Sequence, residues 1–194
     1  MAVFALVNVA ACAAPPGQAL SVGGLAVSER DFEVALDEFG SQVLGTSTTT
    51  AASFASGLIL AEVFDQALEQ IGGPAVTDEE ATDLLNRYRE MGNESRASQG
   101  LEPLPQVESY SQLVLQVVHV DVISERLQIA SELGVSDLDY DALLAALGEL
   151  LPTVEVKVNP RFGQWDPQAG SIGTASFPWS VSASAPTSGG VLTE

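Results

Sequence analysis

Hydrophobic side chains recur at helical spacing along most of the chain. Between residues 52 and 71 they follow one another at steps of three and four, which is the period of one helix face. Four other segments show helical signals as well, so the pattern predicts a mainly α fold, a bundle of about five helices. The expected helices begin after Ser28, span 52–71, run from Thr77 to Met91, span 106–133 and run from Ser136 to Leu151.

Polar residues and glycines mark where these helices start and stop. Thr77 precedes Asp78-Glu79-Glu80, so its side chain is placed to cap a helix while the last glutamate reaches back. Upstream, Gly72-Gly73-Pro74 ends a helix, because glycine adopts the left-handed conformation and proline cannot continue the hydrogen bonds. By the same reasoning the first helix ends at Gly40 or Gly45.

The middle of segment 106–133 is rich in valine, which suits a strand as well as a helix. The whole segment lacks glycine and proline, and strands rarely exceed about ten residues. Both facts favour a helix. Since the segment is apolar on nearly all sides, we expect it to be the central helix of the core.

Short strands are expected at both ends of the helical region. Residues 19–22 and 25–27 are apolar runs around Gly23-Gly24, a pattern typical of a tight hairpin or a bent strand. After Pro152, residues 153–158 alternate between apolar and polar, as a strand with one wet face does. We expect this C-terminal strand to pair with the N-terminal hairpin as a small β element, completing one domain over 19–158.

The chain beyond residue 158 is rich in proline, glycine and serine and carries isolated aromatic residues. We expect an extension over 159–194 whose end is disordered. Phe162, Trp165 and Trp179 are candidate residues for binding apolar polypeptide. The alternative is that they pack the extension against the helical body.

The first eleven residues have the composition of a processing segment. Ala2–Ala11 is apolar apart from Asn8, and as a helix it would span about 15 Å, half of the ~30 Å of a bilayer core. This length fits the apolar part of a signal peptide. Signal peptides begin with a basic residue, and none precedes Arg30, so either the true start lies elsewhere or the sequence is truncated.

Val9-Ala10-Ala11-Cys12 resembles the lipobox of bacterial lipoproteins, in which the chain is cut before the cysteine and the thiol carries a diacylglycerol. The resemblance implies a signal-peptide-like segment over 1–11, lipidation at Cys12 and a tether over 12–18. It also implies an extracytoplasmic protein that is anchored to the outer face of the cytoplasmic membrane through this lipid only. The alternative is a disordered apolar N-terminus with an incidental cysteine.

The charge of the chain narrows its range of partners. Twenty-six acidic residues against seven basic ones give a formal net charge of −19. Such a surface repels phosphates, which argues against nucleic acid and anionic lipid headgroups and leaves basic or apolar partners. Because the acids are spread along the chain, the alternative is that they serve solubility alone.

The titratable residues form no catalytic pattern. His119, the single histidine, lies in an apolar segment near Asp121, where a histidine is more often a satisfied structural residue than a ligand or base. Asp137, Asp139 and Asp141 alternate as in a calcium loop but lack its glycine and closing glutamate. Metal-ligand spacings, phosphate-binding glycine loops and nucleophile elbows are absent from the sequence. We therefore predict a protein that is not an enzyme and uses no metal or cofactor.

Four segments resemble the SurA family of chaperones. Val22–Ser28 is similar to the strand that opens SurA N-terminal domains, and Gly72–Glu80 is similar to a junction between their helices. Gly134–Asp137 precedes a last helix, and Val158–Asp166 resembles lipoproteins of high-GC Gram-positive bacteria that carry a SurA N-terminal domain. The resemblance covers about residues 19–166 and implies a foldase or holdase for unfolded secreted polypeptides.

The family resemblance has one large gap. SurA and PrsA carry a parvulin prolyl isomerase domain before the final helix, where this chain has only a few residues around Ser136 to Asp141. The resemblance therefore implies an envelope chaperone that binds unfolded or secreted polypeptides without isomerase activity. Two other hypotheses remain open: a structural adaptor lipoprotein that docks one envelope partner, and a divergent isomerase.

Overall fold

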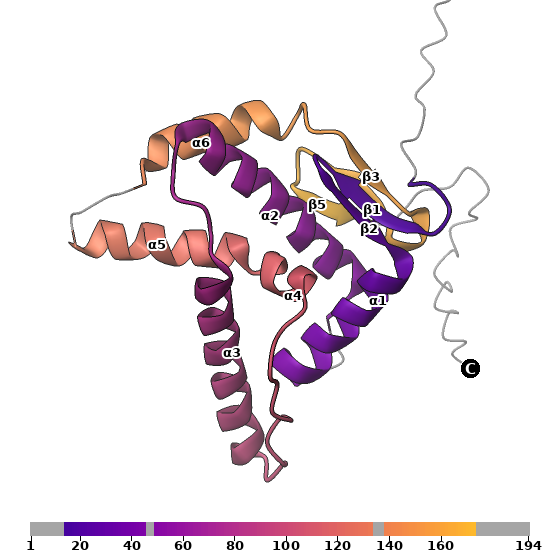
Figure 1. Ribbon diagram of the computed structural model, residues 1–194, viewed down its shortest axis with the longest axis vertical. Coiled ribbons are helices and arrows are strands. Elements are labelled where there is room, and N and C mark those ends of the chain that lie inside the picture. The colour runs from indigo at the N-terminus through magenta and orange to yellow at the C-terminus, as the bar shows by residue number, and fades with distance from the viewer. Residues whose placement is uncertain (1–13, 46–48, 134–137, 174–194) are drawn as a thin grey trace, which may run out of the picture.

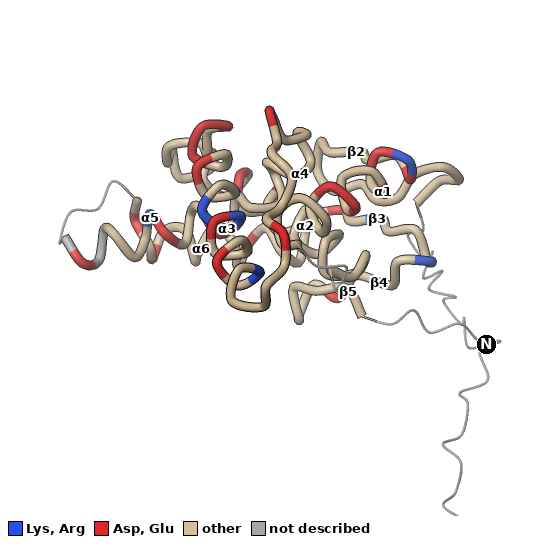
Figure 2. The backbone as a smooth tube through the Cα atoms, turned by 90° about the horizontal axis from the view of Figure 1, so that it is seen from below, with Lys and Arg blue, Asp and Glu red and all other residues tan. Residues whose placement is uncertain are grey.

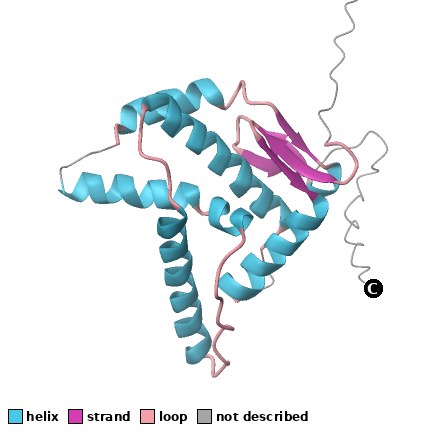
Figure 3. Cartoon of the chain, viewed as in Figure 1, coloured by secondary structure: helices cyan, strands magenta, loops and turns pink. Residues whose placement is uncertain are grey.

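The computed structural model describes residues 14–45, 49–133 and 138–173 (Figure 1). They form a mainly helical fold with a small antiparallel sheet near the two chain ends, as predicted (Figure 3). The helices are α1 Glu29–Glu38, α2 Ala51–Ile71, α3 Asp78–Ser98, α4 Gln112–Val117, α5 His119–Leu133 and α6 Tyr140–Leu150, with a π-helical turn η1 at Phe39–Leu44 and a 3-10 turn η2 at Pro160–Phe162. The strands are β1 Gln18–Val22, β2 Leu25–Ser28, β3 Val156–Val158, β4 Gln164–Asp166 and β5 Ser171–Gly173.

Several predictions concern residues outside these described ranges. They are the signal-peptide-like segment 1–11, lipidation of Cys12, the aromatic Trp179 and the disordered chain end. All of these remain predictions. The last helix, by contrast, begins at Tyr140 with Asp139 as its cap, so its predicted start at Ser136 is wrong.

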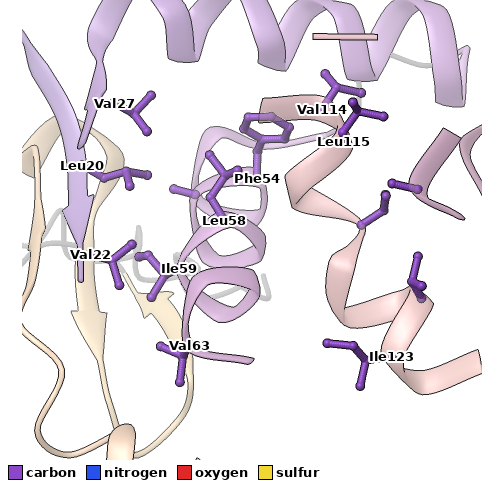
Figure 4. Packing of buried hydrophobic residues seen from close by; sticks show 14 of the residues in the cluster. Leu20, Val22, Val27, Phe54, Leu58, Ile59, Val63, Val114, Leu115 and Ile123 are labelled. Atoms are coloured by element: carbon purple, nitrogen blue, oxygen red, sulfur yellow. The ribbon is translucent and has the colours of Figure 1, made fainter. Parts of the chain in front are cut away.

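α2, rather than segment 106–133, is the central helix. Side chains from the strands, α4 and α5 gather around it (Figure 4), and it contacts α6 as well. α2 is also long and apolar enough to span a membrane by length and composition. Its apolar character is accounted for by this core, because its buried residues are Phe54, Ala55, Leu58, Ile59, Ala61, Val63, Ala67 and Leu68.

A three-stranded antiparallel sheet of order β2-β1-β3 packs against α2. β1 and β2 form the predicted hairpin, with Val22 opposite Leu25. Gly23 has φ 53°, which the first residue of such a two-residue turn requires. β3 lies on the other side of β1, with Ser21 opposite Lys157. The predicted pairing of the C-terminal strand with the hairpin is therefore confirmed, but the strand begins at Val156 and not at residue 153, because residues 153 and 154 form a turn after α6.

α3 begins at the predicted cap and continues further than predicted. The Glu80 N–H donates to Thr77 Oγ1 at 3.3 Å, and the Thr77 N–H donates to Glu80 Oε2 at 3.0 Å. The helix then passes the predicted end at Met91. The loop after α3 supports these added turns, because the N–H of Leu104 in this loop donates to Asn93 Oδ1 of α3 at 2.7 Å.

The prediction of one helix over 106–133 is wrong at two places. Residues 106–111 are irregular, and Val118 separates α4 from α5. Valine lowers helix propensity, and several valines stand around the break at Val118, which is itself buried in the core. In the irregular stretch, hydrogen bonds to α1 and α3 replace helical ones; the Ser111 N–H, for example, donates to a carboxylate of α1 at 3.0 Å.

The folded body continues past the predicted boundary at residue 158. After η2, strands β4 and β5 form an antiparallel hairpin that packs against α2. The N–H of Ile172 donates to Ser56 Oγ at 2.9 Å. Residues 159–173 are therefore part of the same body as the helices.

Candidate functional site

A groove of about 530 Å³ lies between α1, η1 and the loop after α3. This volume falls in the range of about 300–1,000 Å³ that is typical of ligand pockets. Leucine, proline and glycine contribute apolar surface, and the carboxylates of α1 form a rim. We call it the α1 groove, and its lining residues are Glu33, Leu36, Asp37, Gly40, Ser41, Gly45, Thr49, Arg96, Leu104 and Pro105.

Gly45 and Leu104 form one wall of the α1 groove. Gly45 ends η1 with φ 64°, in the left-handed region, and a side chain there would come within 2.7 Å of Leu104 Cδ2. Arg96 of α3, which also lines the groove, holds this wall in place. Its Nε donates to Glu102 O at 2.6 Å and its Nη1 donates to Gly45 O at 3.5 Å. Because these bonds are made within the protein, the wall is formed before any ligand binds.

Glu33 and Asp37 lie one helical turn apart on the rim of the α1 groove. Glu33 Oε1 accepts a hydrogen bond from Arg161 Nη2 at 2.6 Å, and both of these side chains are about half exposed. The backbone oxygen of Asp37 accepts from Ser41 Oγ at 2.6 Å. Its carboxylate makes no hydrogen bond or ion pair with any described residue, so it is available to a basic ligand.

A second groove, of about 320 Å³, lies on the other flank of α1. Ala26 and Val27 of β2 form one wall and residues 111–113 form the opposite wall, with Val34 of α1 beside them. We call this the β2 groove. A third depression, of about 400 Å³, shares Val34 with the β2 groove and shares Asp37 with the α1 groove. The three depressions therefore follow one another around the outer side of α1.

The Val158–Asp166 motif ties the C-terminal strands to α1, through what we call the C-terminal clasp: Asn159, Arg161 and Phe162. Asn159 Nδ2 donates to Glu29 Oε1 at 2.7 Å, and Arg161 Nη1 donates to Glu29 Oε2 at 2.9 Å. The ring of Phe162 lies 4.7 Å from that of Phe32, centroid to centroid. The clasp thus holds the helix that lines both grooves.

The two aromatic candidates that the structure describes, Phe162 and Trp165, do not form an exposed surface site. Phe162 is buried against α1, as part of the clasp. Trp165 is half-buried and packs against the core, and its Nε1 is enclosed without a hydrogen-bond partner among the described residues. Trp179 lies outside the described residues. Neither Phe162 nor Trp165 lines the three depressions around α1.

The Gly72–Glu80 motif joins α2, α3 and α5. From α5, Arg126 Nε and Nη2 donate to Glu80 Oε1 at 3.0 and 2.7 Å, and its guanidinium also donates to Pro74 O at 2.7 Å and Ala75 O at 2.9 Å. The hydrogen bonds from Arg126, followed by those from the Thr77 cap, lower the pKa of Glu80 to about 2. This motif therefore has a structural role at the junction of three helices.

His119 pairs with a carboxylate of α2. Its Nδ1 lies 2.7 Å from Asp65 Oδ2, and the two side chains are 14% and 31% exposed. Asp121, its neighbour in sequence, instead accepts a hydrogen bond from Tyr88 at 3.0 Å. Burial, together with the charge of Asp121, raises the pKa of Tyr88 to about 12. No described hydroxyl or thiol hydrogen-bonds to His119, so the pair has no adjacent nucleophile in this part of the chain.

The aspartates after α5 include a helix cap. Asp139 Oδ1 accepts from the Ala142 N–H at 3.0 Å at the start of α6, whereas Asp137 lies outside the described residues. Within the described ranges, no group of three His, Cys, Asp or Glu side chains is placed to hold a metal ion. Among the described residues, the depressions around α1 are therefore the surface features that we consider as candidate binding sites.

Comparisons with models of protein families, with curated proteins and with solved structures find no match to this chain. The resemblance to SurA-like chaperones thus rests on sequence motifs alone. In the structure, two of these motifs form the α2–α3 junction and the C-terminal clasp described above.

Proposed function

We propose that the protein is a chaperone-like protein of the cell envelope whose α1 groove binds apolar segments of unfolded or exported polypeptides. The observation that carries this proposal is a pre-formed groove with apolar walls and a rim carboxylate, that of Asp37, which pairs with no described residue. Apolar side chains of a client would leave water against Leu36, Leu104 and Pro105. A neighbouring basic side chain of the client would pair with Asp37.

The distribution of charge supports such a client. Acidic positions are spread over the helices and basic ones are few (Figure 2), in keeping with the net charge of −19. The negative electrostatic potential of this surface attracts client segments that carry lysine or arginine, and the net charge keeps a complex with an apolar client soluble.

The exposed apolar residues elsewhere make no comparable site. Outside α1, the large hydrophobic residues that are most exposed in the described ranges belong to several elements: Met91, Leu101, Ile129, Tyr140 and Leu144. Tyr140 and Leu144 lie one turn apart on α6, and the other three lie on separate elements; small exposed apolar groups of this kind are normal on a soluble surface. The concave surface around α1 is therefore favoured as the binding surface.

Two matched serine variants test the proposal. Ser41 lies in the α1 groove and Ser124 lies on α5; both are exposed, and both donate to a backbone oxygen one turn earlier. Ser41→Arg should place a guanidinium beside Asp37, cover the groove and weaken binding of a fluorescent leucine- and arginine-containing peptide about tenfold, or about 1.4 kcal/mol. Ser124→Arg should bind like the wild-type protein.

The result that contradicts the proposal is equally specific. A wild-type protein that neither binds the peptide nor suppresses aggregation of an unfolded client at several-fold excess is not a polypeptide-binding chaperone. Recovery of one stoichiometric partner by pulldown would then favour the adaptor hypothesis. The divergent-isomerase hypothesis is tested separately, by a peptide isomerisation assay at high protein concentration, and we expect no activity.

We also propose that a lipid on Cys12 anchors the protein outside the cytoplasmic membrane. The support is the lipobox-like run Val9-Ala10-Ala11-Cys12. Deleting residues 1–11 and replacing Cys12 by Ser should release the protein from the membrane fraction into the medium. Unchanged partitioning into the membrane would show that this cysteine is not the anchor.

A further inference from the structure

β2 is an edge strand with an unused backbone position. The sheet order β2-β1-β3 leaves β2 with one neighbour among the described strands. Val22 and Leu25 flank the tight turn, so they form a hydrogen-bonded pair. Such pairs alternate with pairs that are not hydrogen-bonded, and the next pair along is Ser21 with Ala26. The N–H and C=O of Ala26 therefore face away from β1.

The other side of β1 supports this assignment. Ser21 lies opposite Lys157 of β3, and the N–H of Asn159 donates to Ala19 O at 2.7 Å. The backbone groups of Ala19 and Ser21 thus face the C-terminal strand. Since Ser21 directs its backbone groups towards β3, it has none to offer Ala26.

The β2 groove runs beside this edge and is lined by Ser111, whose hydroxyl has no partner among the described residues. Val34, whose exposed fraction is 59%, and Leu113 give the groove an apolar surface. Ser111 lines the same groove and precedes α4, but its side chain makes no capping bond. Its Oγ is enclosed and has no partner among the described residues. A buried polar group without a partner is costly, and a change of side-chain rotamer that turns this hydroxyl towards the groove would let a peptide group of a bound segment satisfy it.

We propose that the β2 groove binds an extended segment of a client polypeptide by strand addition to β2. The backbone of the client pairs with the N–H and C=O of Ala26, and its side chains contact Val34 and Leu113. The occupant is an extended polypeptide because the backbone groups of an edge strand pair in register only with another extended backbone. This proposal rests on the proposed function, since it specifies the conformation in which the client is bound.

A pair of peptides tests the backbone contact directly. The probe is a fluorescent peptide of alternating valine and threonine with a terminal arginine, and its matched partner is N-methylated at alternate residues. Methylation removes backbone donors and leaves the side chains in place. The full chain should bind the unmethylated peptide about tenfold more tightly, as expected for the loss of one or two hydrogen bonds.

A pair of variants tests the position on β2. Ala26→Pro should weaken binding of the unmethylated peptide to the level of the methylated one, because proline has no N–H. Proline is tolerated on the open side of an edge strand, where β1 uses no N–H. Ala26→Thr adds side-chain volume in the groove but retains the N–H, so it should still bind the unmethylated peptide more tightly than the methylated one. If the proline variant loses folded content by circular dichroism, slower hydrogen exchange at the Ala26 amide of the wild-type protein on adding peptide takes its place.

The outcomes separate the two proposals. Equal binding of both peptides to the wild-type protein and to both variants overturns strand addition, whereas weaker binding in Ser41→Arg still supports the proposed function. Failure of Ser41→Arg to weaken binding, with the methylation effect intact, overturns the role of the α1 groove and retains strand addition. If the wild-type protein self-associates and Ala26→Pro abolishes this self-association, the β2 edge binds a second copy of the chain, and the proposal that it binds a client polypeptide is overturned.

Discussion

The two ends of the molecule are held together by different forces. The sheet end, which comprises β1–β3, α1 and the C-terminal clasp, buries large side chains such as Leu20 and Phe32 completely. The projecting end comprises α3 and α5: α5 extends away from the sheet (Figure 1), whereas the second half of α3 lies beside η1 and is joined to it by hydrogen bonds of Arg89 and Arg96. The buried residues of α3 are Ala81, Leu84 and Leu85, all in its first half. The sheet end is thus stabilised chiefly by apolar packing, and that packing can hold grooves open without a ligand.

Polar contacts between helices are prominent at the projecting end. Arg126 binds Glu80 and the backbone before α3, Arg87 pairs with a carboxylate of α5, and Tyr88 donates to Asp121. Ion pairs and charge-assisted hydrogen bonds depend on protonation and salt, whereas apolar packing depends on volume. The comparison therefore predicts that acid affects the projecting end first and that truncation of core side chains affects the sheet end most.

The largest effect is expected from Phe32→Ala at the sheet end. The Phe32 ring is fully buried and lies 5.4 Å from Phe54 and 4.7 Å from Phe162, centroid to centroid. Removing it leaves a cavity and should lower the free energy of unfolding by about 3–5 kcal/mol. Urea denaturation measures this loss. A loss below about 1 kcal/mol would show that packing around α1 is not what stabilises the sheet end.

A smaller and more local effect is expected from Arg126→Gln at the projecting end. This change removes the charged partner of Glu80 and should cost about 1–3 kcal/mol. Hydrogen exchange should accelerate in α3 and α5 while the amides of β1 and α2 keep their protection. Uniform acceleration throughout the chain would mean that the two ends unfold as a single unit and that the distinction between them is wrong.

Lowering the pH should reproduce part of the stability loss expected for Arg126→Gln. The pKa of Glu80 is lowered from 4.5 to about 2 in the folded protein. Its contribution to stability is therefore present above about pH 4.5 and is lost as the pH falls towards 2. More than a third of the side chain is exposed, so we discount the shift for solvent screening and expect about 1 kcal/mol. Urea denaturation at pH 5 and pH 2.5 should show this difference in the wild-type protein and a smaller one in Arg126→Gln.

The smallest effect is expected from Arg161→Gln in the C-terminal clasp. Arg161 pairs with Glu29 and Glu33, but its side chain is 52% exposed. Exposed ion pairs contribute about 0–1 kcal/mol, so the thermal midpoint should barely move, whereas Phe32→Ala should lower it strongly. If Arg161→Gln lowered the thermal midpoint as much as Phe32→Ala, the sheet end would be stabilised by ion pairs and not chiefly by apolar packing.

Local signals in the sequence predicted the parts of the fold that depend on neighbouring residues. The Thr77 cap, the turn at Gly23 and the alternation before Val158 each act within a few residues, and the structure has the expected element at each place. The prediction failed at 106–111, where hydrogen bonds to α1 and α3 replace helical ones. Such tertiary contacts leave no periodic trace in the sequence.

The grooves around α1 could not be predicted for the same reason. Leu36 falls in the predicted helix after Ser28 and Pro105 immediately precedes the predicted helix 106–133, and nothing in their spacing indicates that they share a groove. Gly45 gave a partial signal, because a glycine after a helix marks a left-handed residue. Phe162 and Trp165 were candidate binding residues because they are aromatic residues in a polar segment, but Phe162 is buried in the core.

The most direct test of polypeptide binding at the sheet end is a map of amide chemical shifts on adding an unfolded client peptide to the full chain. We expect changes at residues around α1, among them Ala26, Val34 and Asp37, and at Arg96 of α3, which lines the α1 groove, with no change in the outer turns of α5. Changes centred on Met91 and Ile129, where apolar side chains are exposed on the projecting end, would contradict this expectation.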